Sequence, residues 1–304
     1  MNTTTATLTT ASIDSGAGLH EGYATVSDTV TLHYVEAGEG PLVVLLHGFP
    51  AFWYTWREQI APLANAGFRV VAPDLRGYNL SSKPGDFTDY TADKPAADIR
   101  ALIRELGSQK ATVIGHDWGG SVAWTLAMNS PEVVDRLVIL NAAHPRKLNE
   151  GLKHLRQLRR SWYFFYFQLK GSPERHAARD NWKFFKEFLD AEPAYTDQQL
   201  DRYTEAWSQP GAVKGMIDYY RAAVRLGSKQ KVLPISAPTL VIWGQDDRYL
   251  GADLAEPHQE DVPNLVAVER LENASHWVHH DKAARVNELL VDFLAPVRAG
   301  QNGR

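Results

Sequence analysis

Cysteine is absent from this chain of 304 residues, which excludes disulfide bonds and thiolate metal sites. Long apolar runs are absent as well. No stretch approaches the roughly 20 residues that a membrane-spanning helix needs, so we expect no membrane span. A strong charge of either sign is also missing: the formal net charge is −4, and nucleic acid is therefore not expected as a partner. Hydrophobic residues make up 44% of the chain, which is typical of a globular protein with a full core.

The first residues, 1–17, are rich in Thr, Ala and Ser. They have no apolar core preceded by basic residues, as a signal peptide would. We therefore predict a disordered tail over this range and a cytoplasmic location. The oligomeric state is left open, and a homo-oligomer is compatible with the sequence.

Short apolar runs alternate with helical segments along most of the chain. A hairpin pattern covers 22–36, buried-strand patterns occur at 41–46, 68–73, 111–114, 136–141, 238–243 and 264–268, and helical spacing occurs at 52–67, 91–107 and 281–294. Alternation of this kind predicts an α/β fold, with a mostly parallel central sheet flanked by helices and joined by right-handed crossovers.

The alternation stops between 146 and 228. This segment is basic, aromatic and helical in pattern, and it contains no buried-strand run. The simplest interpretation is a single α/β core, formed by 18–145 and 229–304, that is interrupted by a helical cap at 146–228.

A Gly-x-Asp-x-Gly pattern places Asp117 between Gly115 and Gly119, directly after a predicted buried strand. This is the spacing of a nucleophile elbow, a sharp strand-to-helix turn that needs glycine where a Cβ would clash. Serine is the usual occupant. An aspartate, with an ordinary pKa of about 3.9, is already ionised at neutral pH and needs no base before it attacks. A carboxylate nucleophile suits displacement at a saturated carbon, which would leave an alkyl ester on Asp117.

Two further strand ends carry the groups that would complete this chemistry. His276 is the candidate general base, because its ordinary pKa near 6.5 lets it accept a proton at neutral pH. Asp247 is the candidate acid that would orient it, although the adjacent Asp246 fits the same pattern. The order nucleophile, acid, base along the chain is that of the α/β-hydrolases.

The loop at 47–50 follows the first buried strand. The backbone N–H groups of Phe49 and Trp118 are candidates for an oxyanion hole. His47 and Pro50, together with Trp118, are expected to line the substrate site.

Four segments resemble the signature segments of the α/β-hydrolase-fold epoxide hydrolases. They are His-Gly-Phe-Pro at 47–50, Ala-Pro-Asp-Leu-Arg-Gly-Tyr at 72–78, Gly-His-Asp-Trp-Gly-Gly at 115–120 and Ser-His-Trp-Val-His-His-Asp at 275–281. The resemblance covers about 22 to 296. It implies hydrolysis of an epoxide to a vicinal diol with no cofactor and no metal, and as partners a small apolar epoxide and water.

Two cap tyrosines of that family hold the epoxide oxygen. The segment at 161–168 resembles the first tyrosine segment and implies Tyr163, and the segment at 218–221 resembles the second and implies Tyr220. For the neighbouring Tyr166 and Tyr219 we expect a role in the core of the cap.

Two alternatives stay open. Haloalkane dehalogenases share the aspartate nucleophile and often the tryptophan after it, and some of them use a cap tryptophan, for which Trp162, Trp182 and Trp207 are candidates. The other alternative is not an enzyme: a catalytically silent member of the fold that binds a small ligand beneath the cap.

Overall fold

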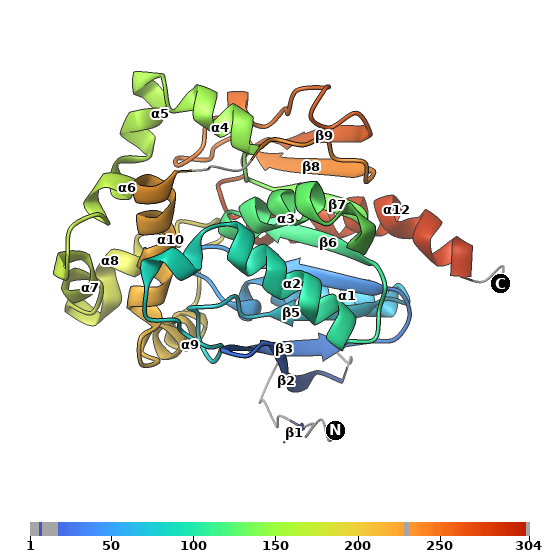
Figure 1. The fold of residues 1–304 in the computed structure, drawn as a ribbon, viewed down its shortest axis with the longest axis horizontal. Coiled ribbons are helices and arrows are strands. Elements are labelled where there is room, and N and C mark those ends of the chain that lie inside the picture. The colour runs from blue at the N-terminus through green and yellow to red at the C-terminus, as the bar shows by residue number, and fades with distance from the viewer. Residues whose placement is uncertain (1–5, 8–17, 228–230, 302–304) are drawn as a thin grey trace.

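A computed structural model describes residues 6–7, 18–227 and 231–301. Its described strands form one sheet of nine, in the order β1-β2-β3-β5-β4-β6-β7-β8-β9 (Figure 1). The strands are β1 (Ala6–Thr7), β2 (His20–Ser27), β3 (Val30–Ala37), β4 (Leu42–Leu46), β5 (Arg69–Pro73), β6 (Ala111–His116), β7 (Val134–Leu140), β8 (Thr239–Gly244) and β9 (Leu265–Leu271). The strands β1, β2, β3 and β5 pair antiparallel, and from β5 to β9 all pairs are parallel.

The central strands are buried along their whole length. Every residue of β4, β6 and β8 is buried, as expected where helices cover both faces of a parallel sheet. Strands β4 and β6 are direct neighbours, with Leu46 opposite Gly115. The loop after β4 and the turn after β6 therefore lie side by side at the same edge of the sheet.

The helices of the core alternate with these strands. They are η1 (Trp53–Trp56), α1 (Arg57–Asn65), η2 (Phe87–Tyr90), α2 (Asp93–Glu105), α3 (Trp118–Asn129), η3 (Pro131–Val133), η5 (Ala252–Leu254), α11 (Val278–Asp281) and α12 (Ala283–Gln301). Helix α2 packs against α3, and α1 packs against α12. The predicted closing helix at 281–294 begins two residues later and extends to Gln301.

Between β7 and β8 the described chain contains helices and no strand. These are α4 (Pro145–Gly151), α5 (Leu155–Arg160), α6 (Trp162–Tyr166), α7 (Ser172–Ala177), η4 (Asp180–Trp182), α8 (Lys183–Lys186), α9 (Asp197–Trp207) and α10 (Ala212–Leu226). Figure 1 shows α5 to α10 gathered at one end of the sheet. We refer to 146–228 as the cap; the division into a core and a separate cap domain stays a prediction.

The predicted disordered tail, 1–17, lies outside the described residues except for Ala6 and Thr7. These two residues pair as β1 with Glu21 and His20 of β2. Of the helices that the structure describes, none has both the length and the apolar character to span a membrane.

Candidate active site

Asp117 lies in a strained turn between β6 and α3. Its φ is 50° and its ψ is −120°, a left-handed conformation that is costly for a residue with a side chain. The turn is packed against its neighbours, because a Cβ at Gly119 would overlap the backbone of Leu46 and one at Gly120 would overlap Ala142. This close packing holds Asp117 at the end of β6, and α3 begins at the next residue.

The Asp117 carboxylate is held from two sides. The Phe49 amide donates a hydrogen bond of 2.7 Å to its Oδ1, and Nε2 of His276 lies 3.5 Å from its Oδ2. The side chain of Asp117 is 17% exposed, so part of the carboxylate stays accessible. Of the two amides expected for the oxyanion hole, that of Phe49 bonds to this carboxylate. That of Trp118 forms no such bond among the described residues.

Asp247 lies at the end of β8 and contacts the other side of His276. Its Oδ2 lies 2.7 Å from Nδ1 of His276 and accepts a hydrogen bond of 2.8 Å from the Asn141 side chain. Its Oδ1 accepts from the amides of Tyr249 and Leu250. The Asp247 side chain is thus fixed in position by four partners.

The structure therefore separates the two adjacent aspartates. Asp246 is exposed, whereas Asp247 is buried and bonds to His276. Asn141, which follows β7, was not among the residues singled out from the sequence. The signal that could have found it is its place: a polar residue at the carboxyl end of a parallel strand.

Charge and burial together perturb the pKa values of this group. Burial alone lowers the pKa of His276, but the carboxylates of Asp247 and Asp117 more than offset it and raise that pKa to about 10. Burial raises the pKa of Asp117, and the hydrogen bond and charge of His276 overcome that effect, so its pKa is lowered. The raised pKa of His276 favours its imidazolium form, and the lowered pKa of Asp117 favours its carboxylate form.

His116 packs behind His276. Its Nε2 lies 2.9 Å from the His276 carbonyl oxygen, and the two rings are 4.7 Å apart. Burial, with the nearby charge of His276, lowers the pKa of His116 to about 3. His116 is thus neutral at physiological pH, and it donates to the His276 carbonyl.

Tyr163 of α6 and Tyr220 of α10 lie together over this group, with their rings 5.6 Å apart. The ring of Tyr220 is 5.1 Å from Phe49 and 5.0 Å from Trp118. Burial and then the charge of Asp117 raise the pKa of both tyrosines well above the ordinary value. Both phenols therefore keep their protons at neutral pH and are available as donors.

The neighbouring tyrosines use their hydroxyls elsewhere. The Tyr219 hydroxyl donates to the carbonyl oxygen of Arg76 at 3.0 Å, and the Tyr166 hydroxyl lies 2.9 Å from Nδ1 of His176. Among the described residues, the Tyr163 hydroxyl has no hydrogen-bond partner. The contacts of the hydroxyls thus distinguish Tyr163 from Tyr166, although both lie on α6.

The loop at 47–50 contributes mainly through its backbone. His47 is fully buried, with the Leu75 amide donating to its Nε2 and its Nδ1 donating to the Gly48 carbonyl, both at 3.0 Å. Neither ring nitrogen is free for a substrate. The carbonyl oxygen of Pro50 accepts from the indole N–H of Trp207. Trp118 differs, because its ring packs against Tyr220 and Phe164 of the cap.

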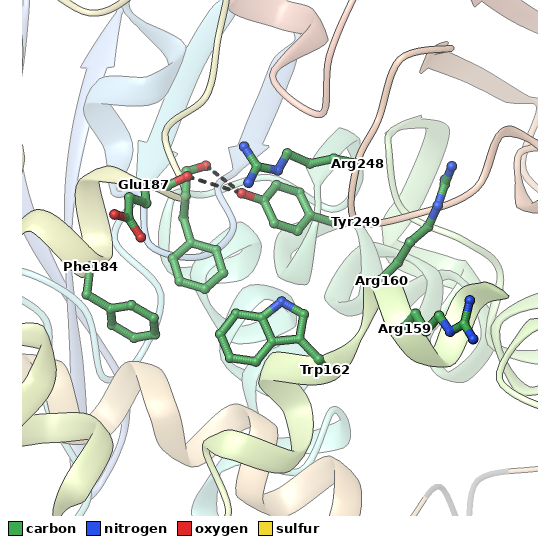
Figure 2. Close-up of a pocket in the computed structure, with 8 residues that line it drawn as sticks. Arg159, Arg160, Trp162, Phe184, Glu187, Arg248 and Tyr249 are labelled. Atoms are coloured by element: carbon green, nitrogen blue, oxygen red, sulfur yellow. Dashed lines mark hydrogen bonds between the residues drawn. The ribbon is translucent and has the colours of Figure 1, made fainter. Parts of the chain in front are cut away.

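A pocket of about 290 Å³ is lined by residues of the cap and of the loop after β8 (Figure 2). Its lining residues are Arg159, Arg160, Trp162, Phe184, Glu187, Phe188, Arg248 and Tyr249. At the inner wall Phe188 and Tyr249 stack with ring centroids 5.7 Å apart. Phe188 is 5.4 Å from Tyr163, and Tyr249 is 5.3 Å from His276. One layer of rings therefore separates the pocket from the catalytic candidates.

Over the residues that the structure describes, no cluster of His, Asp and Glu could hold a metal ion.

The chain is similar to known proteins in both sequence and structure. The family model described as the alpha/beta hydrolase fold matches residues 41–283. The chain is 42% identical to the AB hydrolase superfamily protein YfhM of Bacillus subtilis (strain 168), over 87% of this chain and 94% of that protein. It is 36% identical to epoxide hydrolase 4 of Mus musculus, over 92% and 81%. A crystal structure of a Bacillus megaterium epoxide hydrolase in complex with an inhibitor superimposes with a TM-score of 0.81 at 34% identity, over 90% and 99%.

Proposed function

The chain belongs to the α/β-hydrolase fold family and, within it, to the epoxide hydrolases, and from this premise we propose that it opens its epoxide through a covalent ester on Asp117. The observation that supports this proposal most is the position of one largely buried carboxylate, that of Asp117. It lies against the Phe49 amide, close to His276 and beneath two tyrosines whose pKa values are raised.

In the first step, Oδ2 of Asp117 attacks an epoxide carbon and the carbon–oxygen bond of the ring breaks. Oδ1 stays on the Phe49 amide and becomes the carbonyl oxygen of the ester. Tyr163 and Tyr220 donate hydrogen bonds to the departing oxygen and supply the proton that it takes up, which is then replaced from water. Donors aimed at developing negative charge are typically worth about 10²–10³ in rate each.

Ester formation changes the charge next to His276. The ionised Asp117 is one of the groups that keep the His276 pKa near 10, and the ester is neutral. His276 therefore loses part of the support for its proton once the ester forms, and it becomes a base at neutral pH. The first step thus prepares the base that the second step needs.

In the second step, His276 takes a proton from water, and the hydroxide that results adds to the ester carbonyl carbon. The negative charge on the carbonyl oxygen is held by the Phe49 amide. Asp247 keeps Nδ1 of His276 oriented and stabilises the imidazolium. The intermediate collapses and the bond between the acyl carbon and the alkyl oxygen breaks. The departing alkoxide takes the proton of the added hydroxyl group, so the diol leaves, Asp117 is a carboxylate again and His276 keeps the proton that it took from water.

The surroundings favour an apolar substrate body. Phe49 makes edge contacts with the rings of Phe167, Phe185, Phe188 and Tyr220, all from the cap. Aromatic walls with few polar groups favour an apolar ligand.

The dehalogenase alternative has less support. A halide needs N–H donors beside the nucleophile. The indole N–H of Trp207 is used by the Pro50 carbonyl, and Trp162 is exposed on the outer pocket. Trp182, the third candidate, packs against Trp207 and Phe185, with ring centroids 5.7 and 6.1 Å apart.

The variant His276→Gln tests the proposal because it separates the two steps. Attack by Asp117 needs no base, whereas ester hydrolysis does. Mixed with styrene oxide, the variant should consume about one equivalent and stop, and the intact mass should rise by the whole mass of the epoxide, on the peptide that carries Asp117. The control is His258→Gln. His258 pairs with Glu150 and not with the proposed catalytic groups, so this variant should turn over like the parent.

Normal turnover by His276→Gln would remove His276 as the base. An adduct on another peptide would remove Asp117 as the nucleophile. Binding of epoxides by the parent without turnover would favour the silent ligand-binding alternative.

A further inference from the structure

Basic charge is concentrated in one part of the cap. Residues 151–186 contain nine lysines and arginines and only two acidic residues, Glu174 and Asp180, in a chain with a formal net charge of −4. Lys153, Arg156 and Lys170 are all exposed. The outer cap is therefore positive on a protein that is otherwise acidic, and this asymmetry favours an anionic partner at this face.

The same segment exposes large apolar side chains. Leu155 is 73% exposed, Trp162 53%, Phe165 57% and Leu169 52%. These four are nearly half of the nine large hydrophobic residues that are exposed in the described chain. They recur at intervals of seven, three and four residues along two short helices, α5 and α6, and the turn after α6, while Tyr163 and Phe167 between them are buried. Figure 1 shows α5 and α6 on the outer edge of the cap.

This face is held in place from behind. The Gln168 side chain donates to the carbonyls of Phe164 and Tyr220, at 2.9 and 3.1 Å. Arg221 donates to the Leu169 carbonyl at 2.8 Å, and Arg225 donates to the Gln168 carbonyl at 2.8 Å. The backbone that carries the apolar residues is thus bonded to α10, and the side chains on its other side face outward.

The face adjoins the pocket beside the catalytic candidates. Trp162 belongs to the exposed row and also lines the pocket, together with Arg159 and Arg160 (Figure 2). An apolar molecule at this face would meet the pocket directly.

We propose that the cap face formed by Leu155, Trp162, Phe165 and Leu169 docks on an anionic phospholipid surface. Apolar and aromatic side chains at the headgroup level, flanked by lysine and arginine, are the features of interfacial binding. The basic residues attract the phosphates, and the apolar row enters the acyl boundary. The consequence for catalysis rests on the proposed function: an apolar epoxide dissolved in the lipid would reach the pocket without crossing water.

Other occupants fit the surface less well. A symmetric contact with a second copy would bring this basic segment against itself. A nucleic acid would use the charges and leave Leu155 and Leu169 without a role. The charge and the apolar row together favour a lipid surface.

Sedimentation with vesicles tests the proposal in the full chain, and it does not depend on turnover. We expect binding to vesicles of phosphatidylcholine with phosphatidylglycerol, weakened by added salt, and far less binding to phosphatidylcholine alone. Arg156→Gln with Lys170→Gln should weaken binding about 25-fold, at about fivefold for each charge removed. Arg100→Gln with Lys110→Gln, at two exposed basic residues outside the cap, should change it little.

The apolar row has its own pair of variants. Phe165→Ser with Leu169→Ser should weaken vesicle binding by at least about tenfold, because the apolar area of both side chains no longer enters the lipid. Val266→Ser, at a residue 61% exposed on β9, is the matched control and should bind like the parent. Because neither Phe165 nor Leu169 lines the pocket, turnover of a short water-soluble epoxide should stay at the parent rate.

Three results would overturn the proposal. The first is no vesicle binding at low salt. The second is a dimer in light scattering that Phe165→Ser with Leu169→Ser dissociates, which would make this face an interface between copies. The third is salt-sensitive binding to a nucleic acid duplex with none to vesicles. If the parent binds vesicles but does not turn over any epoxide, the proposed function alone is refuted.

Discussion

The coupling between Asp117 and His276 predicts how the variant Asp117→Asn should titrate. The asparagine is neutral and close in shape to the ester, so it stands for the site after the first step. Oδ2 of Asp117 lies 3.5 Å from Nε2 of His276. At an effective dielectric constant of about 20, two unit charges at this distance interact by about 5 kcal/mol.

This energy converts directly into a pKa change. Since one pKa unit corresponds to about 1.4 kcal/mol, removing the Asp117 charge should lower the pKa of His276 by roughly 3.5. The parent value is about 10, so the histidine of the variant should titrate in the neutral range. The sign follows from the charges: losing an anion removes support for the imidazolium, while Asp247 continues to hold Nδ1 at 2.7 Å.

The measurement is a pH titration of histidine ring signals by NMR, with the His276 signal assigned from its loss in His276→Gln. Asp246→Asn is the control, because it removes an equal charge from an exposed neighbour of Asp247, where water and salt screen the effect. An unchanged pKa of His276 in Asp117→Asn would refute the coupling. A neutral His276 in the parent at pH 7 would refute the resting charge state itself.

Two further predictions concern the groups around this pair. Tyr163→Phe and Tyr220→Phe should each slow epoxide opening by about 10²–10³ in single-turnover experiments, whereas Tyr166→Phe should stay near the parent rate because its hydroxyl contacts His176. Equal loss in all three variants would contradict the assignment. Asp247→Asn should slow ester hydrolysis by about 10⁴ in stopped-flow measurements and leave ester formation largely intact, because the asparagine no longer fixes the histidine tautomer. The matched variant Asp246→Asn should hydrolyse the ester normally, and slow hydrolysis there would shift the role to Asp246.

Much of the chemistry could be predicted from local patterns. The glycines around Asp117 are needed because the turn lies against Leu46 and Ala142, and such close packing leaves a strong signal in the sequence. Buried parallel strands likewise have continuous apolar runs, because helices cover both faces. The predicted fold class and the resemblance to epoxide hydrolases are confirmed by the family match and by the relatives.

The choices between neighbouring residues needed the tertiary structure. Asp246 and Asp247 are identical in chemistry, and only the end of β8 and the side chain of Asn141 bring one of them to His276. His47 had the right residue type for a site, but the Leu75 amide, distant in sequence, occupies its ring nitrogen.

By itself, the sequence predicted the kind of nucleophile and the order of the proposed catalytic groups, and it determined the alternation that builds the sheet. The elbow pattern and the alternation depend on residues within a few positions of one another, and the order of the groups can be read directly along the chain. Tertiary structure alone showed that the hydroxyls of Tyr166 and Tyr219 are engaged elsewhere, since that depends on what α6 and α10 pack against. The tertiary structure also raises the pKa of His276, because the pKa of a buried group is set by the charges that surround it. Here those charges come from the ends of β6 and β8, 130 positions apart between Asp117 and Asp247.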